Sequence, residues 1–231
     1  MSNSIRTYCT FQAKDNKSSK IIEYRIQDLP DDRFDEAIDL LCVHFLPDEP
    51  MTLCRNLHGN ENDKKEICKL LMEIMKQGLS IVCFRNDGGD DVIVGVNLLT
   101  VKCRDEVKSC FEHQGLNDIC EALTYTFNQA DIFNRYNIDK YLGSFCLVVN
   151  RSYRNCGIAK EILKSRRFVM QKLGLDVTAT AFSGPGSQKA AEGAGYEDIY
   201  SISYEDLKKI SPNFDFINKM SNVFKIKVLK L

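Results

Sequence analysis

The stretch from Leu142 to Ala159, LGSFCLVVNRSYRNCGIA, constrains the fold more than any other part of the chain. Its first half is apolar and predicts a buried strand, and its second half is a polar turn that runs directly into an amphipathic segment. A strand that ends at the first turn of a helix leaves backbone N–H groups unpaired, with the positive end of the helix dipole behind them. The pattern predicts an α/β protein with a seat for phosphate at this turn.

The residue types in the turn fit this reading. Gly157 and Ala159 let a ligand approach the backbone, and Arg154 can add positive charge. The spacing matches neither the three-glycine dinucleotide fingerprint nor the Gly-Lys-Ser/Thr of the P-loop. Strand, glycine and helix also make an ordinary α/β connection, so the turn alone is a weak signal, and pyrophosphate is the ligand that suits it best.

Composition narrows the functional class. With 231 residues, 44% of them apolar, the chain can bury one substantial core, so we expect one domain over residues 21–231 after a polar, mobile segment over residues 1–20. A net charge of −1 and a pI near 6.3 argue against a nucleic-acid partner. No apolar run approaches the roughly 18 residues that cross a bilayer, and the first residues lack a secretory signal. We expect a cytoplasmic monomer with no membrane partner.

The ten cysteines suggest neither a disulfide framework nor a metal site. Their spacing contains no Cys-x-x-Cys, and several lie in apolar runs where a core residue belongs. We therefore expect reduced thiols and no metal.

Hydrophobic periodicity predicts the remaining elements. Helices are predicted over residues 30–45, 63–77, most of 103–140, 157–174 and 187–194. Strands are predicted over residues 21–27, 79–85, 92–101, 145–148, 177–182, 196–204 and 216–228, with a hairpin turn at 86–90. The basic residues of the helix after Gly157 are expected to form a solvated face: Lys164, Arg166, Arg167 and Lys172.

Two motifs now point to a known family. Arg154-x-x-Gly157-x-Ala159 after a strand, followed by a second strand and then Ala-Glu-Gly-Ala-Gly-Tyr at 191–196, resembles the acetyl-CoA-binding core of the GNAT superfamily of N-acetyltransferases. The block at 44–51, HFLPDEPM, is similar to one near the start of the insect arylalkylamine N-acetyltransferases, which acetylate dopamine, octopamine, serotonin and tryptamine. The resemblance implies a GNAT fold of class α/β (α+β), with one mixed, splayed central sheet flanked by helices.

The resemblance also implies acetyl-CoA as co-substrate. In this superfamily the strands before the turn and after the helix splay apart, and backbone groups in the resulting V pair with the pantetheine arm. On this resemblance the main chain of Cys146, Leu147 and Val148 would bind the arm. The pyrophosphate would lie against the turn formed by Arg154, Asn155, Cys156, Gly157, Ile158 and Ala159.

A small-molecule amine is the implied second substrate, and it must lose a proton before it can attack. Deprotonating an alkylammonium of pKa near 10.4 at neutral pH costs about 4.6 kcal/mol, so direct transfer in a ternary complex needs a base. The resemblance implies that Glu49, which lies between Pro47 and Pro50, is this base, because its counterpart in the insect enzymes has that role. Without the resemblance, Asp48 and Glu49 would be read as a solvated pair; His44 and His58 are lesser candidates.

The departing thiolate needs a proton as well. Many superfamily members supply it from a tyrosine at the position that is Ala191 here, so the usual acid is absent. Ser183 and Ser187 fall where the insect enzymes place two catalytic serines, and such hydroxyls could relay protons or orient the thioester. Alternatively, Ser187 caps the short helix. The glycines at 184 and 186 depart from the relatives and put the identity of the amine in doubt.

Two alternatives remain open at this stage. The same transfer could serve a polyamine, agmatine or another small amine, because Asp48 and Glu49 could attract a second cation. The chain could also be a CoA-binding module that has lost transfer activity, although both Glu49 and the serine pair are present.

Overall fold

The computed structural model describes residues 5–14, 20–86, 91–106, 110–217 and 223–231. Within these ranges eight strands form one sheet in the order β1-β2-β3-β4-β5-β6-β8-β7. The strands are β1 Thr7–Lys14, β2 Ile21–Asp28, β3 Ile81–Asn86, β4 Val92–Cys103, β5 Lys140–Val149, β6 Val177–Phe182, β7 Glu197–Ser203 and β8 Val223–Lys230. Neighbouring strands are antiparallel except β5 and β6, which are parallel, so the predicted mixed sheet is confirmed.

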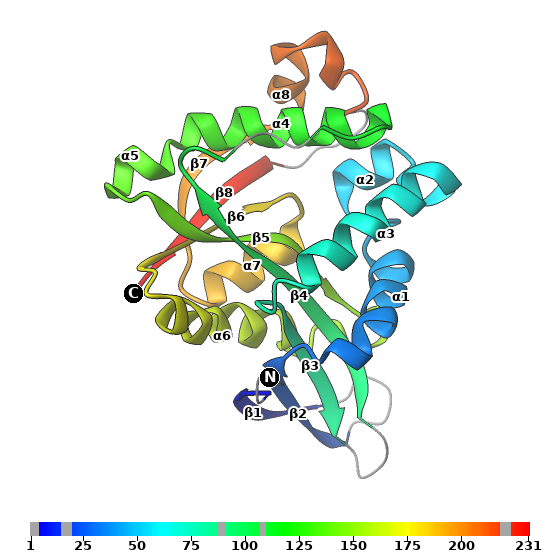
Figure 1. The fold of residues 1–231 in the computed structure, drawn as a ribbon, viewed down its shortest axis with the longest axis vertical. Helices are drawn as coiled ribbons and strands as arrows, with labels where there is room; N and C mark the ends of the chain where they lie inside the picture. The colour runs from blue at the N-terminus through cyan, green and yellow to red at the C-terminus, as the bar shows by residue number, and fades with distance from the viewer. Residues whose placement is uncertain (1–4, 15–19, 87–90, 107–109, 218–222) are drawn as a thin grey trace.

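Helices cover both faces of this sheet (Figure 1). The helices are α1 Phe34–His44, α2 Pro50–Cys54, α3 Glu61–Met75, α4 Gln114–Ala130, α5 Ile132–Tyr136, α6 Ile158–Leu173, α7 Pro185–Gly193 and α8 Tyr204–Ile210. The apolar stripes of α1, α3 and α4 pack in one buried cluster with one face of the central strands, and the stripe of α6 packs against the other face. The sheet therefore lies between two separate apolar layers.

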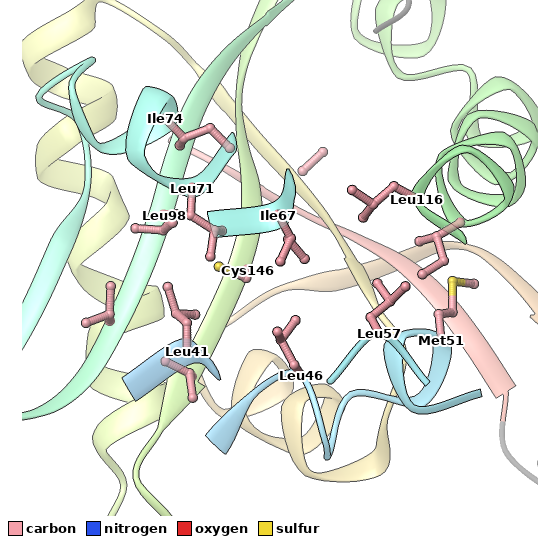
Figure 2. Close-up of a cluster of buried hydrophobic side chains, with 14 of the residues drawn as sticks. Leu41, Leu46, Met51, Leu57, Ile67, Leu71, Ile74, Leu98, Leu116 and Cys146 are labelled. Atoms are coloured by element: carbon pink, nitrogen blue, oxygen red, sulfur yellow. The ribbon is translucent and has the colours of Figure 1, made fainter. Parts of the chain in front are cut away.

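The cluster on the α1 side reaches the middle of β5 (Figure 2). Leu41 of α1 and Leu71 of α3 lie near Leu98 of β4 and Cys146 of β5, and all four side chains are buried. Burial also raises the pKa of the Cys146 thiol. Cys146 is therefore a core residue by its side chain, and only its main chain is left for a ligand.

Local patterns predicted most elements, and the exceptions have physical causes. The strand at 177–182 and the helix at 157–174 are confirmed as β6 and α6. Within the segment over residues 1–20 that we expect to be mobile, Thr7–Lys14 forms β1 and pairs with β2, with a register shift between Thr7 and Cys9. Residues 87–90 of the predicted hairpin turn lie outside the described residues. The short helix predicted at 187–194 begins earlier, at Pro185, because proline suits the first helical position.

The predicted solvated face of α6 is wrong at one position. Arg166 is fully buried, whereas Lys164 and Arg167 are exposed. The cause is the helical repeat: Arg166 lies four residues after Ile162 and three before Val169, so it shares the stripe that packs against the sheet. The charge of an arginine side chain predicts that it is exposed, but the position of Arg166 on the helix places it against the sheet.

Candidate active site

The parallel pair at the centre of the sheet opens into a V. β5 and β6 pair only at Leu142 with Thr178 and at Gly143 with Ala179. Beyond that point β5 keeps its pairing with β4 and β6 keeps its pairing with β8, each on its outer edge. The inner edges, residues 144–149 and 180–182, therefore face each other without a mutual ladder. Such edges can accept an extended, amide-bearing ligand as an added strand.

A bulge marks the start of the V. Leu98 pairs with Cys146 and Leu99 pairs with Ser144, so Phe145 is an extra residue on β5. Its large side chain is 36% exposed although the strand runs through the middle of the sheet. The bulge thus removes one residue from the ladder at the place where β5 and β6 separate.

The polar turn follows the open end of β5. Asn155 has φ of 65° and Gly157 has φ of 79°, a left-handed conformation that favours glycine. A Cβ on Gly157 would meet no atom within 4 Å, so the backbone faces open space there. Gly157 is the N-cap of α6, and the first amides of that helix have no partner inside it. The turn therefore presents N–H groups at the mouth of the V.

The side chains of the turn are used within the protein. The Cys156 thiol is buried and donates to the carbonyl of Lys14 at 3.4 Å, and Ile158 is buried in the layer under α6. The Arg154 guanidinium donates from Nε to the carbonyl of Val149 at 3.1 Å and from Nη2 to the carbonyl of His44 at 3.0 Å. These side chains hold the turn in place, and the main chain is what faces outward.

Asp48 ties the turn to the segment that carries Glu49. Its carboxylate accepts two hydrogen bonds from Arg151, at 2.9 and 2.6 Å, and forms an ion pair with Arg154 at 2.7 Å. The hydrogen bond from Arg151 is the main reason that the pKa of Asp48 falls to about 2. Asp48 is therefore an anion at neutral pH, and its charge is already met by two arginines.

Glu49 is held at the beginning of α2. Its carboxylate accepts the amide of Thr52 at 2.8 Å as the N-cap of that short helix. Leu46 and Met51 on either side of it are each 1% exposed and lie in the cluster of Figure 2. The Thr52 hydroxyl donates to the carbonyl of Leu46 at 2.8 Å. The loop is thus anchored at both ends, which places a partly buried carboxylate at a fixed position.

The loop after β6 lies beside Glu49. The Tyr204 hydroxyl donates to the carbonyl of Ser183 at 2.9 Å, and burial, together with the charge of Glu49, raises the pKa of Tyr204. A Cβ on Gly184 would lie 3.9 Å from Cγ of Pro50. The structure therefore brings Glu49 and Ser183 together with a neutral, buried Tyr204 hydroxyl.

Ser187 lies in the first turn of α7, and it does not cap that helix. Gly184 is the N-cap, and the Ser187 hydroxyl donates to its carbonyl at 2.9 Å. Ala191 is fully buried in a small apolar cluster with Phe182. The alternative in which Ser187 is the capping residue is wrong, because the helix starts two residues before it.

The histidines lie in different surroundings. His44 ends α1, and burial, reinforced by the charges of Arg151 and Arg154, lowers its pKa. His58 is exposed in a short 3₁₀ turn.

In the described part of the chain no group of three or more His, Cys, Asp and Glu side chains is arranged to hold a metal ion, and no disulfide joins the cysteines. A search of the described helices found none with the length and apolarity to traverse a bilayer.

Hydrophobic periodicity misplaces one residue of the site, Tyr204. The periodicity predicts that Tyr204 ends a strand at 196–204, whereas this residue opens α8. Ser203 caps this helix by accepting the amide of Asp206 at 3.0 Å. The Ser-x-x-Asp spacing is the signal that could have moved the boundary.

Solved structures resemble this fold closely. A protein provisionally named arylalkylamine N-acetyltransferase 7, from the yellow fever mosquito Aedes aegypti, is 36% identical with a TM-score of 0.93, over 99% of this chain and 96% of that one. Arylalkylamine N-acetyltransferase 2 of Aedes aegypti is 20% identical with a TM-score of 0.75, over 90% and 98%. A Drosophila melanogaster polyamine N-acetyltransferase that forms N-acetylagmatine is 16% identical with a TM-score of 0.73, over 90% and 100%.

The last two likenesses show the fold alone, whereas the first extends to the sequence of nearly the whole chain. No protein-family model and no curated protein matches the chain. The V between β5 and β6, the turn at the N-terminus of α6 and the mixed sheet are the architecture that the motifs implied. Together with the 36% identity over 99% of the chain, they show that the chain belongs to the GNAT N-acetyltransferases, most like the arylalkylamine N-acetyltransferases of insects, and is an acetyltransferase.

Proposed function

We propose that this enzyme transfers the acetyl group of acetyl-CoA to a primary arylalkylamine of the dopamine, octopamine, serotonin or tryptamine class. Transfer is direct, in a ternary complex, with Glu49 as the base. The observation that carries the proposal is the closeness of two loops: a Cβ on Gly184 would lie 3.9 Å from Cγ of Pro50, the residue after Glu49, and the Tyr204 hydroxyl of α8 donates to the carbonyl of Ser183 at 2.9 Å. In this proposal a base and a hydroxyl group lie beside the open strand edges.

The residues of the V and the turn fit acetyl-CoA. The inner edge of β5 at Cys146, Leu147 and Val148 would bind the pantetheine arm through its main chain, since no strand covers it there. The amides of residues 154–159 would hold the pyrophosphate at the N-terminus of α6. Acetyl-CoA supplies an activated acetyl group with thiolate as leaving group. The protein supplies alignment and proton transfer.

Glu49 would take up the proton that the ammonium group loses. Its Oε2 atom accepts the amide of Thr52, and the carboxylate has further lone pairs for a proton delivered directly or through water. Anchoring of Leu46 and Met51 in the core keeps it from turning to solvent. A fixed carboxylate near the amine reduces the entropy lost on reaching the transition state.

The hydroxyls would serve the leaving group. The Ser187 hydroxyl donates to Gly184 and leaves its oxygen able to accept, and the Ser183 hydroxyl lies next to the carbonyl bound by Tyr204. A serine hydroxyl both donates and accepts, so it can pass a proton although it is a weak acid. Tyr204 is the positioning residue of this loop in our scheme.

A polyamine or agmatine is the second candidate for the amine substrate, and the ion pairs of Asp48 argue against it. Such a substrate carries a second cation that Asp48 was expected to attract. Arg151 and Arg154 already satisfy Asp48, so the loop presents Glu49 with little additional negative charge. With Asp48 neutralised, Glu49 is the carboxylate that this loop offers, which favours a substrate with a single cation, such as an arylalkylamine.

An amine panel tests the proposal. The purified chain is mixed with acetyl-CoA and each of dopamine, octopamine, serotonin, tryptamine, agmatine and spermidine, and released thiol is measured. Longer acyl-CoA donors are included, because the space beyond the thioester sets the chain length. We expect the arylalkylamines to give the highest kcat/KM. A preference for agmatine or spermidine would contradict the substrate class. No thiol release above the amine-free background with any of the amines would identify a chain that does not transfer.

Glu49→Gln tests the base. The amide keeps the size of the side chain but cannot take up a proton, so kcat at neutral pH should fall by about 10²-fold or more while CoA affinity stays within twofold. The matched control is Glu36→Gln, which changes a carboxylate of α1 that binds the amide of Ile93 at 3.1 Å. An unchanged rate in the Glu49 variant would remove Glu49 from the mechanism.

A further inference from the structure

Arg166 is a fully buried cation in the middle of α6. Its Nε donates to Oδ1 of Asn97 on β4 at 2.8 Å, and its Nη1 donates to the hydroxyl of Thr180 on β6 at 2.6 Å. β4 and β6 lie on opposite sides of β5 in the sheet. The guanidinium therefore passes beneath β5 and connects the two strands that flank it.

This connection lies at the point where the V opens. The last paired residues are Gly143 and Ala179, so Ser144 and Thr180 are the first residues of the two open edges. Arg166 binds Thr180 directly. Asn97, held by Arg166, donates from Nδ2 to the Ser144 hydroxyl and to the Cys146 carbonyl, each at 2.7 Å. One guanidinium thus fixes both arms of the V and the bulged segment between Ser144 and Cys146.

The positive charge of Arg166 is not neutralised nearby. In the described ranges no carboxylate forms an ion pair with it, and its Nη2 has no hydrogen-bond partner. Tyr196 is the titratable side chain that faces it: its ring centre lies 5.9 Å from the guanidinium carbon, and its hydroxyl interacts with the guanidinium by charge and hydrogen bonding. Burial lowers the pKa of Arg166, but a guanidinium stays protonated in proteins. Burial raises the pKa of Tyr196, so this phenol is neutral. A buried, unpaired charge is costly, and a merely structural role is served more cheaply by an apolar residue.

We propose that Arg166 is a positioning residue for acetyl transfer, which sets the opening of the V through Thr180 and Asn97 and supplies a positive field at its apex. This role rests on the proposed function of the V as the seat of the thioester. Transfer forms a bond from the amine nitrogen to the acetyl carbon and breaks the bond from that carbon to sulfur. The amine proton goes to the base, and the electron pair of the broken bond stays on sulfur. A cation beneath the V stabilises that developing negative charge.

The bound product reports this field directly. A positive charge within about 8 Å at an effective dielectric near 20 lowers a thiol pKa by about 1.5. CoA labelled with ¹³C at the carbon bonded to sulfur gives an NMR shift that follows thiol ionisation without interference from the ten cysteines of the protein. We expect the thiol pKa of CoA bound to the wild-type chain to lie at least about one below that of CoA free in the same buffer.

Three variants separate the causes. In Arg166→Gln the pKa of the bound thiol should return toward that of free CoA and kcat should fall about tenfold or more, whereas Arg166→Lys keeps the charge and should keep the lowered pKa. Arg167→Gln removes a charge from the exposed side of the same helix and should leave the pKa unchanged. If Arg166→Gln does not fold, Arg166→Met takes its place, because an apolar side chain of similar length removes the charge without leaving a buried polar group unpaired, and the same return of the thiol pKa is expected.

The outcomes distinguish the two proposals. CoA that binds with an ordinary thiol pKa, or a lowered pKa that persists in Arg166→Gln, would overturn the role of Arg166 and leave the proposed function standing. Absence of CoA binding to the wild-type chain in calorimetry would overturn the proposed function and this role together.

Discussion

Replacing Asp48 with asparagine removes the charge that joins the Glu49 loop to the polar turn. The side chain keeps its size, but an amide has one acceptor oxygen, so one of the two hydrogen bonds from Arg151 is lost, the other has a neutral acceptor, and the ion pair with Arg154 is lost. The two guanidinium groups then face each other without a carboxylate between them. We expect the variant to fold, with lower stability and a looser Glu49 loop.

The size of the effect follows from the pKa. The pKa of Asp48 falls from 3.8 to about 2 in the folded chain. At about 1.36 kcal/mol for each pKa step, this difference corresponds to at most about 2.4 kcal/mol. The side chains of Arg151 and Arg154 are 47% and 40% exposed, so water and salt screen the interaction, and we expect about 1 kcal/mol.

The sign of the pH dependence is fixed by the direction of the shift. Because the folded chain holds the carboxylate ionised at lower pH than the unfolded chain does, the stabilisation is complete above about pH 4 and is lost as the pH falls toward about 2. The difference between the wild type and Asp48→Asn should therefore be constant near neutrality and shrink in acid. It should also shrink at high salt.

Urea unfolding measures this difference without adding salt. Midpoints and slopes are recorded at neutral pH and in steps down to about pH 3, and equal slopes license the comparison. Asp139→Asn is the matched control, since the Asp139 side chain is 88% exposed in its pair with Arg104 and should contribute nothing measurable. Equal stability of Asp48→Asn and wild type at neutral pH and low salt, or a difference that does not change in acid, would refute the reasoning.

Three further substitutions test the site. Tyr204→Phe removes the hydrogen bond to the Ser183 carbonyl, so the carbonyl loses its donor. We expect the free energy of unfolding in urea to fall by about 1 kcal/mol and kcat to fall as well. Wild-type stability and kcat would show that this hydrogen bond does not position the loop. Gly157→Ala forces a side chain into φ of 79° and should cost about 1 kcal/mol and weaken CoA binding in calorimetry, with Gly186→Ala, where a Cβ meets no atom within 4 Å, as control; unchanged CoA affinity would count against the turn as the phosphate seat. Ser187→Ala removes the hydroxyl bound to Gly184 and should slow turnover modestly in the thiol assay, and a wild-type rate would leave Ser187 a structural role only.

The sequence predicts an element of the fold well when the residues that stabilise the element lie within it, and poorly when they lie far away in the chain. β6 and α6 follow from apolar periods inside each segment, and their bounds are close to those predicted. The sequence pattern misses β1 because half of its residues are polar and none of them is buried. It is held by distant partners, with Tyr8 stacked on Phe168 at 5.7 Å between ring centres and Phe11 on Tyr24 at 5.3 Å.

The residues of the candidate site also fall into those that a local motif marks and those that only the fold brings together. The turn at 154–159 and the acidic loop at Glu49 are contiguous motifs, so a resemblance could find them. Tyr204 and Arg166 act through partners far away in the chain, and nothing next to them in the sequence marks that role. From the sequence, Asp48 and Glu49 could attract the second cation of a polyamine, and only the fold brings Arg151 and Arg154 onto Asp48.

A crystal structure with bound CoA tests the central claim most directly. The account predicts pyrophosphate oxygens within hydrogen-bond distance of the amides of residues 154–159, and a pantetheine arm paired with the inner edge of β5 at Cys146 and Val148. CoA bound elsewhere, with the V and the turn still facing solvent, would contradict the account and remove the basis for the roles of Glu49, Ser183 and Arg166.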